Sequence, residues 1–123
     1  MSYKILVVED NPQNRMLLRD VLLFHGFETM EAENGQQGLE MARKFKPDLI
    51  LMDIQMPLMD GVTAGKILKE DAATRGIKLI ALTSFAMMGD RERFTEAGFD
   101  GYISKPVDTR ALSDMIREML AAG

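Results

Sequence analysis

Residues 49–61 read LILMDIQMPLMDG, and this stretch decides the fold. Four consecutive apolar side chains, Leu49 to Met52, lead directly into Asp53, and turn residues follow at Pro57 and Gly61. A short apolar run closed by turn residues is typical of a strand that is buried on both faces of a parallel sheet. Such a strand gains nothing from a carboxylate at its end. Asp53 therefore indicates that something at this end of the strand requires negative charge.

Apolar runs of strand length alternate with helix-like patterns along the rest of the chain. Strands are expected at residues 4–8, 27–32, 48–53, 77–82 and 101–104. Helices are expected from Asn11-Pro12 to Gly26, from Asn34-Gly35 to Phe45, at 62–69, at 88–97 and after Asp108. Strict alternation with mostly apolar strands predicts an α/β fold, with a parallel sheet covered by helices on both faces. No linker or repeat interrupts the pattern, so residues 1–123 are expected to form a single domain.

The spacing of apolar residues predicts which helix faces are buried. The inward residues are expected to be Met16, Leu17, Val21 and Phe24; then Leu39, Met41, Ala42 and Phe45; then Ala64, Ile67 and Leu68; and finally Leu112, Met115, Ile116, Met119 and Leu120. The segment 88–97 has a poor apolar stripe, which predicts a weakly anchored helix.

The composition excludes several classes of protein. The chain is 46% apolar and 28% charged with a net charge of −4, which is typical of a soluble globular domain and argues against nucleic-acid binding. No apolar run approaches the roughly 18 residues that a membrane-spanning helix needs, and the amino-terminal residues do not resemble a signal peptide. The absence of cysteine excludes disulfides and thiolate sites. A cytoplasmic protein is expected.

Polar side chains follow the expected strands at one edge of the sheet. Glu9 and Asp10 follow the first strand and Asp53 ends the third, while Thr83 follows the fourth and Lys105 the fifth. Ligands of open parallel sheets bind beyond the carboxyl ends of the strands. We therefore expect these five residues to form one site.

The residue types indicate the chemistry of this site. Three crowded carboxylates repel one another unless a cation lies between them, and hard oxygen ligands favour magnesium, with manganese as an alternative. A lysine and a threonine hydroxyl both suit a phosphate oxygen. Carboxylates serve as covalent phosphoryl acceptors in aspartyl-phosphate intermediates. Asp53 is the expected acceptor, because its strand lies between those that carry the other acids and the lysine.

The same residues resemble the receiver domain of two-component response regulators, the CheY-like family, across essentially the whole chain. The matching stretches are VVEDN (7–11), DLILMDIQMPLMDG (48–61), LTSFA (82–86) and YISKP (102–106). The resemblance implies a flavodoxin-like (βα)5 three-layer sandwich, with a five-stranded parallel sheet in the order 2-1-3-4-5.

The resemblance also implies a role for each site residue. It implies that Asp53 accepts a phosphoryl group from a kinase histidine, and that Lys105 and Thr83 contact that group. It implies that Glu9 and Asp10 hold Mg²⁺ together with Asp53, and that the main-chain carbonyl of Gln55 completes the protein ligands. The Lys105–Pro106 peptide is expected to be cis, and Tyr102 is expected to be an aromatic switch that rotates inward when Thr83 engages the phosphate.

Within the family, the chain is most similar to the small DivK-type regulators of bacterial cell-cycle signalling. VVEDNPQNRMLLRDVL (7–22), TSFAMMGDRER (83–93) and GYISKPVD (101–108) carry this likeness. The implied partners are a sensor histidine kinase or histidine phosphotransferase and a downstream regulatory protein. The chain is expected to be a monomer, with dimerisation on phosphorylation as an alternative. Because no output segment follows the last helix, the output is expected to be a protein contact. An excised receiver of a hybrid kinase, or a phosphorelay shuttle, remains an alternative.

A surface near the site is expected to bind partners. Its residues would be Phe85, Met87, Met88, Tyr102 and Pro106. Methionine is unbranched and polarizable, so it adapts to irregular surfaces. The apolar Phe85 side chain is also expected to shield the phosphoryl group from water.

Three other functions fit these residues less well than a phosphorylation switch does. A phosphohydrolase with an aspartyl-phosphate intermediate commonly has a second acid two residues after the nucleophile, where this chain has Gln55. A flavin carrier would need a hydroxyl- or glycine-rich phosphate loop after the first strand, where this chain has acids. A constitutive binding module would have no use for the full set of site residues. We expect no enzymatic turnover beyond the chain's own phosphorylation and slow dephosphorylation.

Overall fold

The computed structural model describes residues 3–56, 59–84 and 90–122, and it contains the alternating elements that the sequence predicts. The strands are β1 (Lys4–Val8), β2 (Glu28–Ala32), β3 (Leu49–Asp53), β4 (Lys78–Thr83) and β5 (Gly101–Ser104). The helices are α1 (Pro12–Phe24), α2 (Gly35–Phe45), α3 (Gly61–Glu70), α4 (Asp90–Glu96) and α5 (Thr109–Ala122). Their bounds differ from the predicted ones by only one or two residues at most ends.

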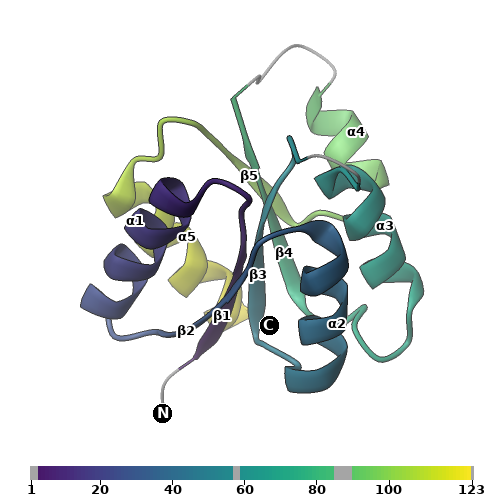
Figure 1. The fold of residues 1–123 in the computed structure, drawn as a ribbon, viewed down its shortest axis with the longest axis horizontal. Helices are drawn as coiled ribbons and strands as arrows, with labels where there is room; N and C mark the ends of the chain where they lie inside the picture. Colours follow the sequence, from purple (N-terminus) through teal and green to yellow (C-terminus); the bar gives the residue numbers. More distant parts are fainter. Residues whose placement is uncertain (1–2, 57–58, 85–89, 123) are drawn as a thin grey trace.

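All five strands are parallel and form one sheet in the order β2-β1-β3-β4-β5, as predicted. β3 is therefore the central strand, and Asp53 stands at its carboxyl end. Helices α1 and α5 cover one face of the sheet and α2, α3 and α4 cover the other, so the fold has three layers (Figure 1). None of the described helices combines the length and the apolar character that a bilayer span requires.

Side-chain caps fix where the helices begin near the carboxyl edge of the sheet. Asn11 Oδ1 accepts hydrogen bonds from the main-chain nitrogens of Gln13 and Asn14, and Pro12 occupies the first turn of α1. Asp60 caps α3 in the same way, by accepting from the Thr63 nitrogen at 2.8 Å. A side chain at Gly61 would collide with the main-chain oxygen of Asp53, so only glycine lets α3 begin this close to β3.

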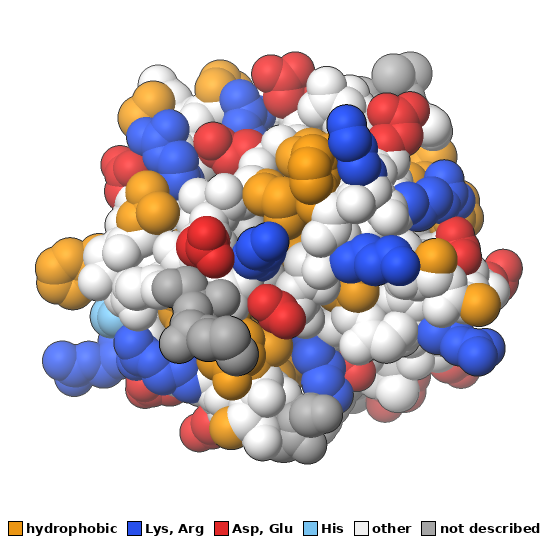
Figure 2. Space-filling view, turned by 90° about the horizontal axis from the view of Figure 1, so that it is seen from below, with side chains coloured by type: hydrophobic (Ala, Val, Ile, Leu, Met, Phe, Trp, Pro, Cys, Tyr) orange, Lys and Arg blue, Asp and Glu red, His pale blue; other side chains and the backbone are white. Residues whose placement is uncertain are grey.

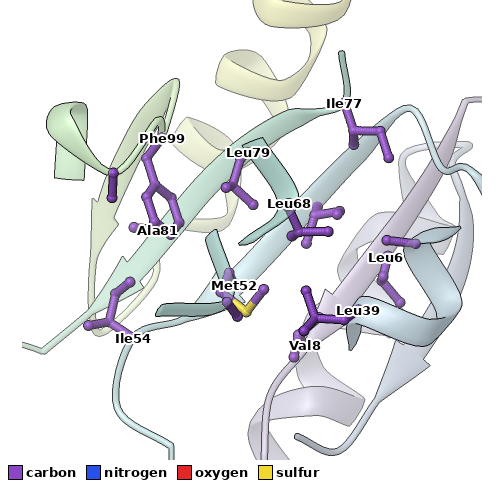
Figure 3. Close-up of a cluster of buried hydrophobic side chains, with 14 of the residues drawn as sticks. Leu6, Val8, Leu39, Met52, Ile54, Leu68, Ile77, Leu79, Ala81 and Phe99 are labelled. Atoms are coloured by element: carbon purple, nitrogen blue, oxygen red, sulfur yellow. The ribbon is translucent and has the colours of Figure 1, made fainter. Parts of the chain in front are cut away.

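Two apolar clusters hold the layers together, one on each face of the sheet. The cluster under α2, α3 and α4 is shown in Figure 3, where Leu39 and Leu68 of the helices lie over Leu6, Met52 and Leu79 of the strands. The other cluster joins Leu18 and Leu22 of α1 and Leu112 and Ile116 of α5 to the opposite side chains of the same strands. The central strands are thus buried on both faces, as their continuous apolar sequences predict.

The prediction for the buried face of α1 was wrong. Met16, Leu17 and Phe24 are 52%, 55% and 85% exposed, whereas Leu18 and Leu22 are buried. The inward stripe contains Arg15, whose side chain is only 15% exposed. This polar residue interrupts the apolar periodicity, so the sequence pattern places the stripe on the wrong side of the helix. Phe45 was also predicted to be buried and is 46% exposed, with the Lys44 ammonium over its ring.

Helix α4 covers Asp90–Glu96, and the predicted start at residue 88 lies outside the described residues. One aromatic side chain anchors it to the sheet: Phe94 is 2% exposed, and its ring lies 6.0 Å from those of Phe99 and Tyr102. Ala97 is also buried, just after the helix. Among the described residues of α4, the buried apolar face therefore depends on one large side chain, that of Phe94, in agreement with the poor apolar stripe in the sequence.

Candidate functional site

The polar residues predicted from the strand ends are brought together at the carboxyl edge of the sheet. Glu9, Asp10 and Asp53 each offer a carboxylate oxygen, and these oxygens all lie within 4.8 Å of one another. Glu9 and Asp53 are only 1% and 2% exposed, whereas Asp10 is exposed. Two buried acids and one exposed acid thus direct carboxylate oxygens at one point, which is close enough to all three for a single ion to contact them.

Lys105 is the cation of this site. Its ammonium lies 3.3 Å from Asp53 Oδ1 and 3.4 Å from Glu9 Oε2. The Lys105 main-chain nitrogen also donates to the Thr83 carbonyl oxygen at 2.7 Å, which ties the residue after β5 to the end of β4. The Lys105–Pro106 peptide is cis, as predicted. One lysine therefore pairs with both buried carboxylates of the site.

Local hydrogen bonds orient Asp53. Its Oδ1 accepts from the Gln55 main-chain nitrogen at 3.0 Å, which turns the chain immediately after β3. The Ile54 nitrogen donates to the Leu82 oxygen at 3.0 Å, so the turn stays attached to β4. The contacts with the Gln55 nitrogen and the Lys105 ammonium are both made by Oδ1 and not by Oδ2, the second carboxylate oxygen of Asp53.

The electrostatics of the site favour protonation of Glu9. Its pKa is raised from an ordinary value of 4.5 to about 7, first by burial, and then by the hydrogen bond to Asp53 and the charge of Asp53. The charge of Lys105 and a hydrogen bond from Asn14 oppose this rise but do not cancel it. The site therefore carries more negative charge than its own lysine neutralises.

The donor set fits a hard divalent cation. The ligands of an octahedral Mg²⁺ lie about 2.1 Å from the ion, so opposed oxygens are roughly 4.2 Å apart, close to the span of these carboxylates. The pKa of Glu9 is raised by burial and by Asp53 even though Lys105 is adjacent, so a further positive charge at this position would be stabilised by the acids. The residues present thus fit magnesium.

The remaining predicted residues lie around this centre. Thr83 is 2% exposed at the end of β4, where it pairs in register with Ser104. Tyr102 is half-buried on β5, with its ring against Phe94 of α4. Pro106 is exposed beside Lys105. Phe85, Met87 and Met88 lie outside the described residues.

A cleft of about 390 Å³ opens on the Lys105 side of the site. It separates α1 from the segment that follows β5. The residues that line it include Glu9, Asn14, Leu17, Lys105, Pro106 and Val107. The charged centre is therefore bordered by an apolar wall, to which the exposed side of α1 contributes.

Two residues that contact the acids were missed in the sequence. Asn14 Nδ2 donates to Glu9 Oε1 at 3.3 Å, and the Arg15 guanidinium donates to the Glu9 main-chain oxygen at 2.9 Å. Both lie in the first turn of the helix that follows Asp10. The sequence could have indicated these contacts, because both residues lie about one helical turn after the acids. The first turn of a helix that follows a strand lies beside the end of that strand.

Comparison with known proteins agrees with this geometry. The model of the family described as "Response regulator receiver domain" matches residues 5–117. The chain is 43% identical to the polar-differentiation response regulator DivK of Brucella anthropi over 98% of both chains. Its structure is similar to that of a response regulator from Chloroflexus aurantiacus, with a TM-score of 0.93 and 26% identity over 98% of this chain and 99% of that one.

A further solved structure bears on the metal. The receiver domain of a sensor histidine kinase from Pseudomonas aeruginosa, which holds a magnesium ion in its active site cleft, has a TM-score of 0.90 to this chain. The two are 31% identical over 98% of this chain and 99% of that one. The acidic cluster found here and the ion in that relative both suggest that this chain binds magnesium.

Proposed function

The chain belongs to the response regulator receiver domain family, and from this premise we propose that it is a phosphorylation switch whose covalent acceptor is Asp53. The observation that carries the proposal is the place of Asp53. It ends the central strand, is 2% exposed, lies within 4.8 Å of two other acids and stands 3.3 Å from the Lys105 ammonium.

The proposed reaction uses one carboxylate oxygen of Asp53 as the nucleophile. This oxygen attacks the phosphorus of a phosphohistidine on a kinase or phosphotransferase. As the O–P bond forms, the P–N bond of the donor breaks, and its electron pair returns to the imidazole nitrogen. The product is an acyl phosphate on Asp53. Since Oδ1 already accepts from Gln55 and faces Lys105, we assign the attack to Oδ2.

We propose that Mg²⁺ is held by Glu9, Asp10 and Asp53, with the Gln55 carbonyl as a further ligand. When bound, the ion supplies positive charge that neutralises the acids and the phosphoryl oxygens. Lys105 would then pair with the phosphoryl group that Asp53 carries. The Thr83 hydroxyl would donate a hydrogen bond to a phosphoryl oxygen. Manganese has the same preference for oxygen ligands and would serve as a substitute.

The switch would transmit this change to the face formed by α4, β5 and α5. Phosphorylation adds close to one further negative charge and new acceptor oxygens beside Thr83 and Lys105. Movement of Thr83 toward them would open space for the half-buried Tyr102, whose ring already contacts Phe94 of α4. Shifting such a switch from 1:99 to 99:1 takes about 5.5 kcal/mol, so several charge-assisted hydrogen bonds must act together.

The proposed partners follow from the chemistry. The donor is a sensor histidine kinase or a histidine phosphotransferase, and the likeness to DivK suggests a role in cell-cycle signalling. The output is a protein contact at a face that includes Tyr102 and Pro106. Phe85, Met87 and Met88 are proposed for the same face on the sequence alone. Transfer onward to a phosphotransferase, as in a relay, is the second candidate.

Phosphorylation by a small-molecule donor tests this proposal. Wild-type chain incubated with phosphoramidate and Mg²⁺ should gain the mass of one PO₃ unit, and the modification should map to Asp53. Asp53→Asn should gain none, whereas Asp20→Asn, an exposed acid on α1, should behave like wild type. Labelling of wild type at another residue would contradict the proposal. Continuous release of inorganic phosphate at the rate of donor loss, without accumulation of the adduct, would identify a phosphohydrolase instead.

A further inference from the structure

Arg15 connects three segments of the chain beside the acidic site. One of its terminal nitrogens donates to the Glu9 main-chain oxygen at 2.9 Å. Its Nε lies 3.6 Å from Glu31 Oε1, and its other terminal nitrogen lies 3.8 Å from Glu33 Oε1. The guanidinium therefore joins α1 to the end of β1 and to the end of β2, and only 15% of the side chain is exposed.

These contacts complete the fixation of Glu9. Its main-chain nitrogen donates to the Ala32 oxygen at 3.1 Å, and its main-chain oxygen accepts from Arg15. The same carbonyl belongs to the peptide unit that leads into Asp10. The two hydrogen bonds hold the peptide planes on either side of the Glu9 Cα, and the Arg15 contact fixes the plane from which the exposed Asp10 side chain starts, which restricts its direction.

The two acids on the β2 side keep the Arg15 charge away from the carboxylates. Glu31 and Glu33 pair with the guanidinium, while the α1 side chain that contacts the Glu9 carboxylate is the neutral Asn14, at 3.3 Å. An arginine that paired directly with Glu9 or Asp10 would compete with a cation for the same oxygens. In the observed arrangement Arg15 contacts the main chain of Glu9 and leaves its carboxylate to other partners.

We propose that Arg15 is a positioning residue for the magnesium site: by holding the Glu9 carbonyl, it pre-orients the carboxylates of Glu9 and Asp10 for the ion. This inference rests on the proposed function, because it assumes that these residues bind Mg²⁺. Residues that orient metal ligands commonly contribute about 10- to 100-fold to metal affinity, although they do not touch the ion.

The sign of the effect distinguishes positioning from simple electrostatics. Arg15 is a cation near an anionic site, so by Coulomb's law alone its removal should strengthen Mg²⁺ binding. If it positions the ligands, its removal should weaken Mg²⁺ binding. Arg19 offers a matched control: it lies one turn further along α1 and contacts Glu31 at 4.0 Å and Asp20 at 3.0 Å.

The test is the Mg²⁺ dissociation constant, measured by titration calorimetry on wild type, Arg15→Met, Arg15→Lys and Arg19→Met. We expect Arg15→Met to bind about tenfold more weakly than wild type. Arg15→Lys keeps the charge but loses the planar fork, and we expect an intermediate loss of at least about threefold. Arg19→Met should bind as wild type does or slightly more tightly. Equal or tighter binding by Arg15→Met would overturn the inference.

Two further results separate this inference from its premise. If wild type itself shows no saturable Mg²⁺ binding, the proposed metal site fails, and the role of Arg15 fails with it. If wild type binds and both Arg15 variants bind equally well, only the positioning role is wrong. Unfolding of each variant in EDTA shows whether it is folded before titration. Should Arg15→Met be unfolded, the dissociation constant of Arg15→Lys decides.

Discussion

The two edges of the sheet use acidic residues in opposite ways. At the amino edge, two acids accept hydrogen bonds that stabilise the fold: Asp48 accepts from the Lys4 nitrogen at 2.8 Å, and Asp100 accepts from the Leu79 nitrogen at 2.8 Å and from Lys69 at 3.1 Å. At the carboxyl edge, Glu9, Asp10 and Asp53 lie close together, and Lys105 pairs with Glu9 and Asp53. Figure 2 shows the amino edge, where charged side chains of both signs are interspersed.

The pKa values record the same difference. At the carboxyl edge the pKa of Glu9 is raised to about 7, first by burial and then by Asp53. Near the amino edge the pKa of Asp71 is lowered, first because the Ala73 nitrogen donates to its carboxylate and then because Arg43 does. A raised pKa means that folding disfavours the charged acid, and a lowered pKa means that folding favours it. The charge of Asp71 thus stabilises the fold, whereas the charge of Glu9 is kept at a cost, which is characteristic of a functional site.

The largest expected effect is on the amino edge. Asp100→Ala removes the acceptor of the Leu79 main-chain nitrogen, which belongs to a residue that is 1% exposed, and it also removes the partner of Lys69. An unsatisfied buried N–H and a lost charge-assisted bond should lower the free energy of unfolding by about 2 kcal/mol. Urea denaturation measures this change.

Asp100→Asn is the matched control, because its amide oxygen still accepts from Leu79. It should lose less than half as much as Asp100→Ala. If both variants were as stable as wild type, the hydrogen bonds of this edge would not be a source of stability, and the contrast between the edges would be lost.

The same kind of substitution at the carboxyl edge should have the opposite sign. Glu9→Gln removes a buried charge that Asp53 repels, so in EDTA it should raise the free energy of unfolding by an amount on the order of 1 kcal/mol at pH 8. Glu28→Gln, at an exposed position on β2, should leave stability within about 0.5 kcal/mol of wild type. Destabilisation by Glu9→Gln in EDTA would show that the acids are already neutralised without a metal.

The pH dependence of the unfolding free energy of the metal-free chain should also show the cost of the Glu9 charge. Glu9 has a folded pKa of about 7 and an ordinary value of 4.5, so between these values the folded chain binds its proton more tightly than the unfolded chain does. The stability that this proton confers is present below about pH 4.5 and is lost as the pH rises through 7. The difference in unfolding free energy between Glu9→Gln and wild type should therefore grow from pH 5 to pH 8. A difference that is constant over this range would contradict the raised pKa.

The sequence predicts where the polar residues of the carboxyl edge lie better than it predicts which residues surround them. Asp53, Lys105 and Thr83 follow apolar strands, and parallel strands bring their carboxyl ends to one edge whatever the details of packing. The inward face of α1 was misjudged because Arg15 lies on it. An arginine is predicted to face solvent, and only the positions of Glu31, Glu33 and the Glu9 carbonyl explain why this one does not. Every residue has a main-chain carbonyl, so the sequence does not show that Arg15 will bind the one at Glu9.

The smallest expected effect is at Asp71, near the amino edge, and it should have the reverse pH dependence to that of Glu9. A lowered pKa means that the ionised carboxylate contributes stability above its ordinary value of 3.8, and this contribution is lost as the pH falls through the folded value. Since Arg43 and Asp71 are both partly exposed, the contribution should be small.

Asp71→Asn keeps an oxygen for the Ala73 nitrogen but loses the charge beside Arg43, so it should be slightly less stable than wild type at pH 6 and equal to it near pH 2.5. Thermal unfolding at the two pH values measures this convergence, and Asp20→Asn, which removes an exposed carboxylate, provides the comparison. If the gap between Asp71→Asn and wild type widened on acidification, Asp71 would resemble Glu9, and the two edges would no longer differ in how folding treats their acids.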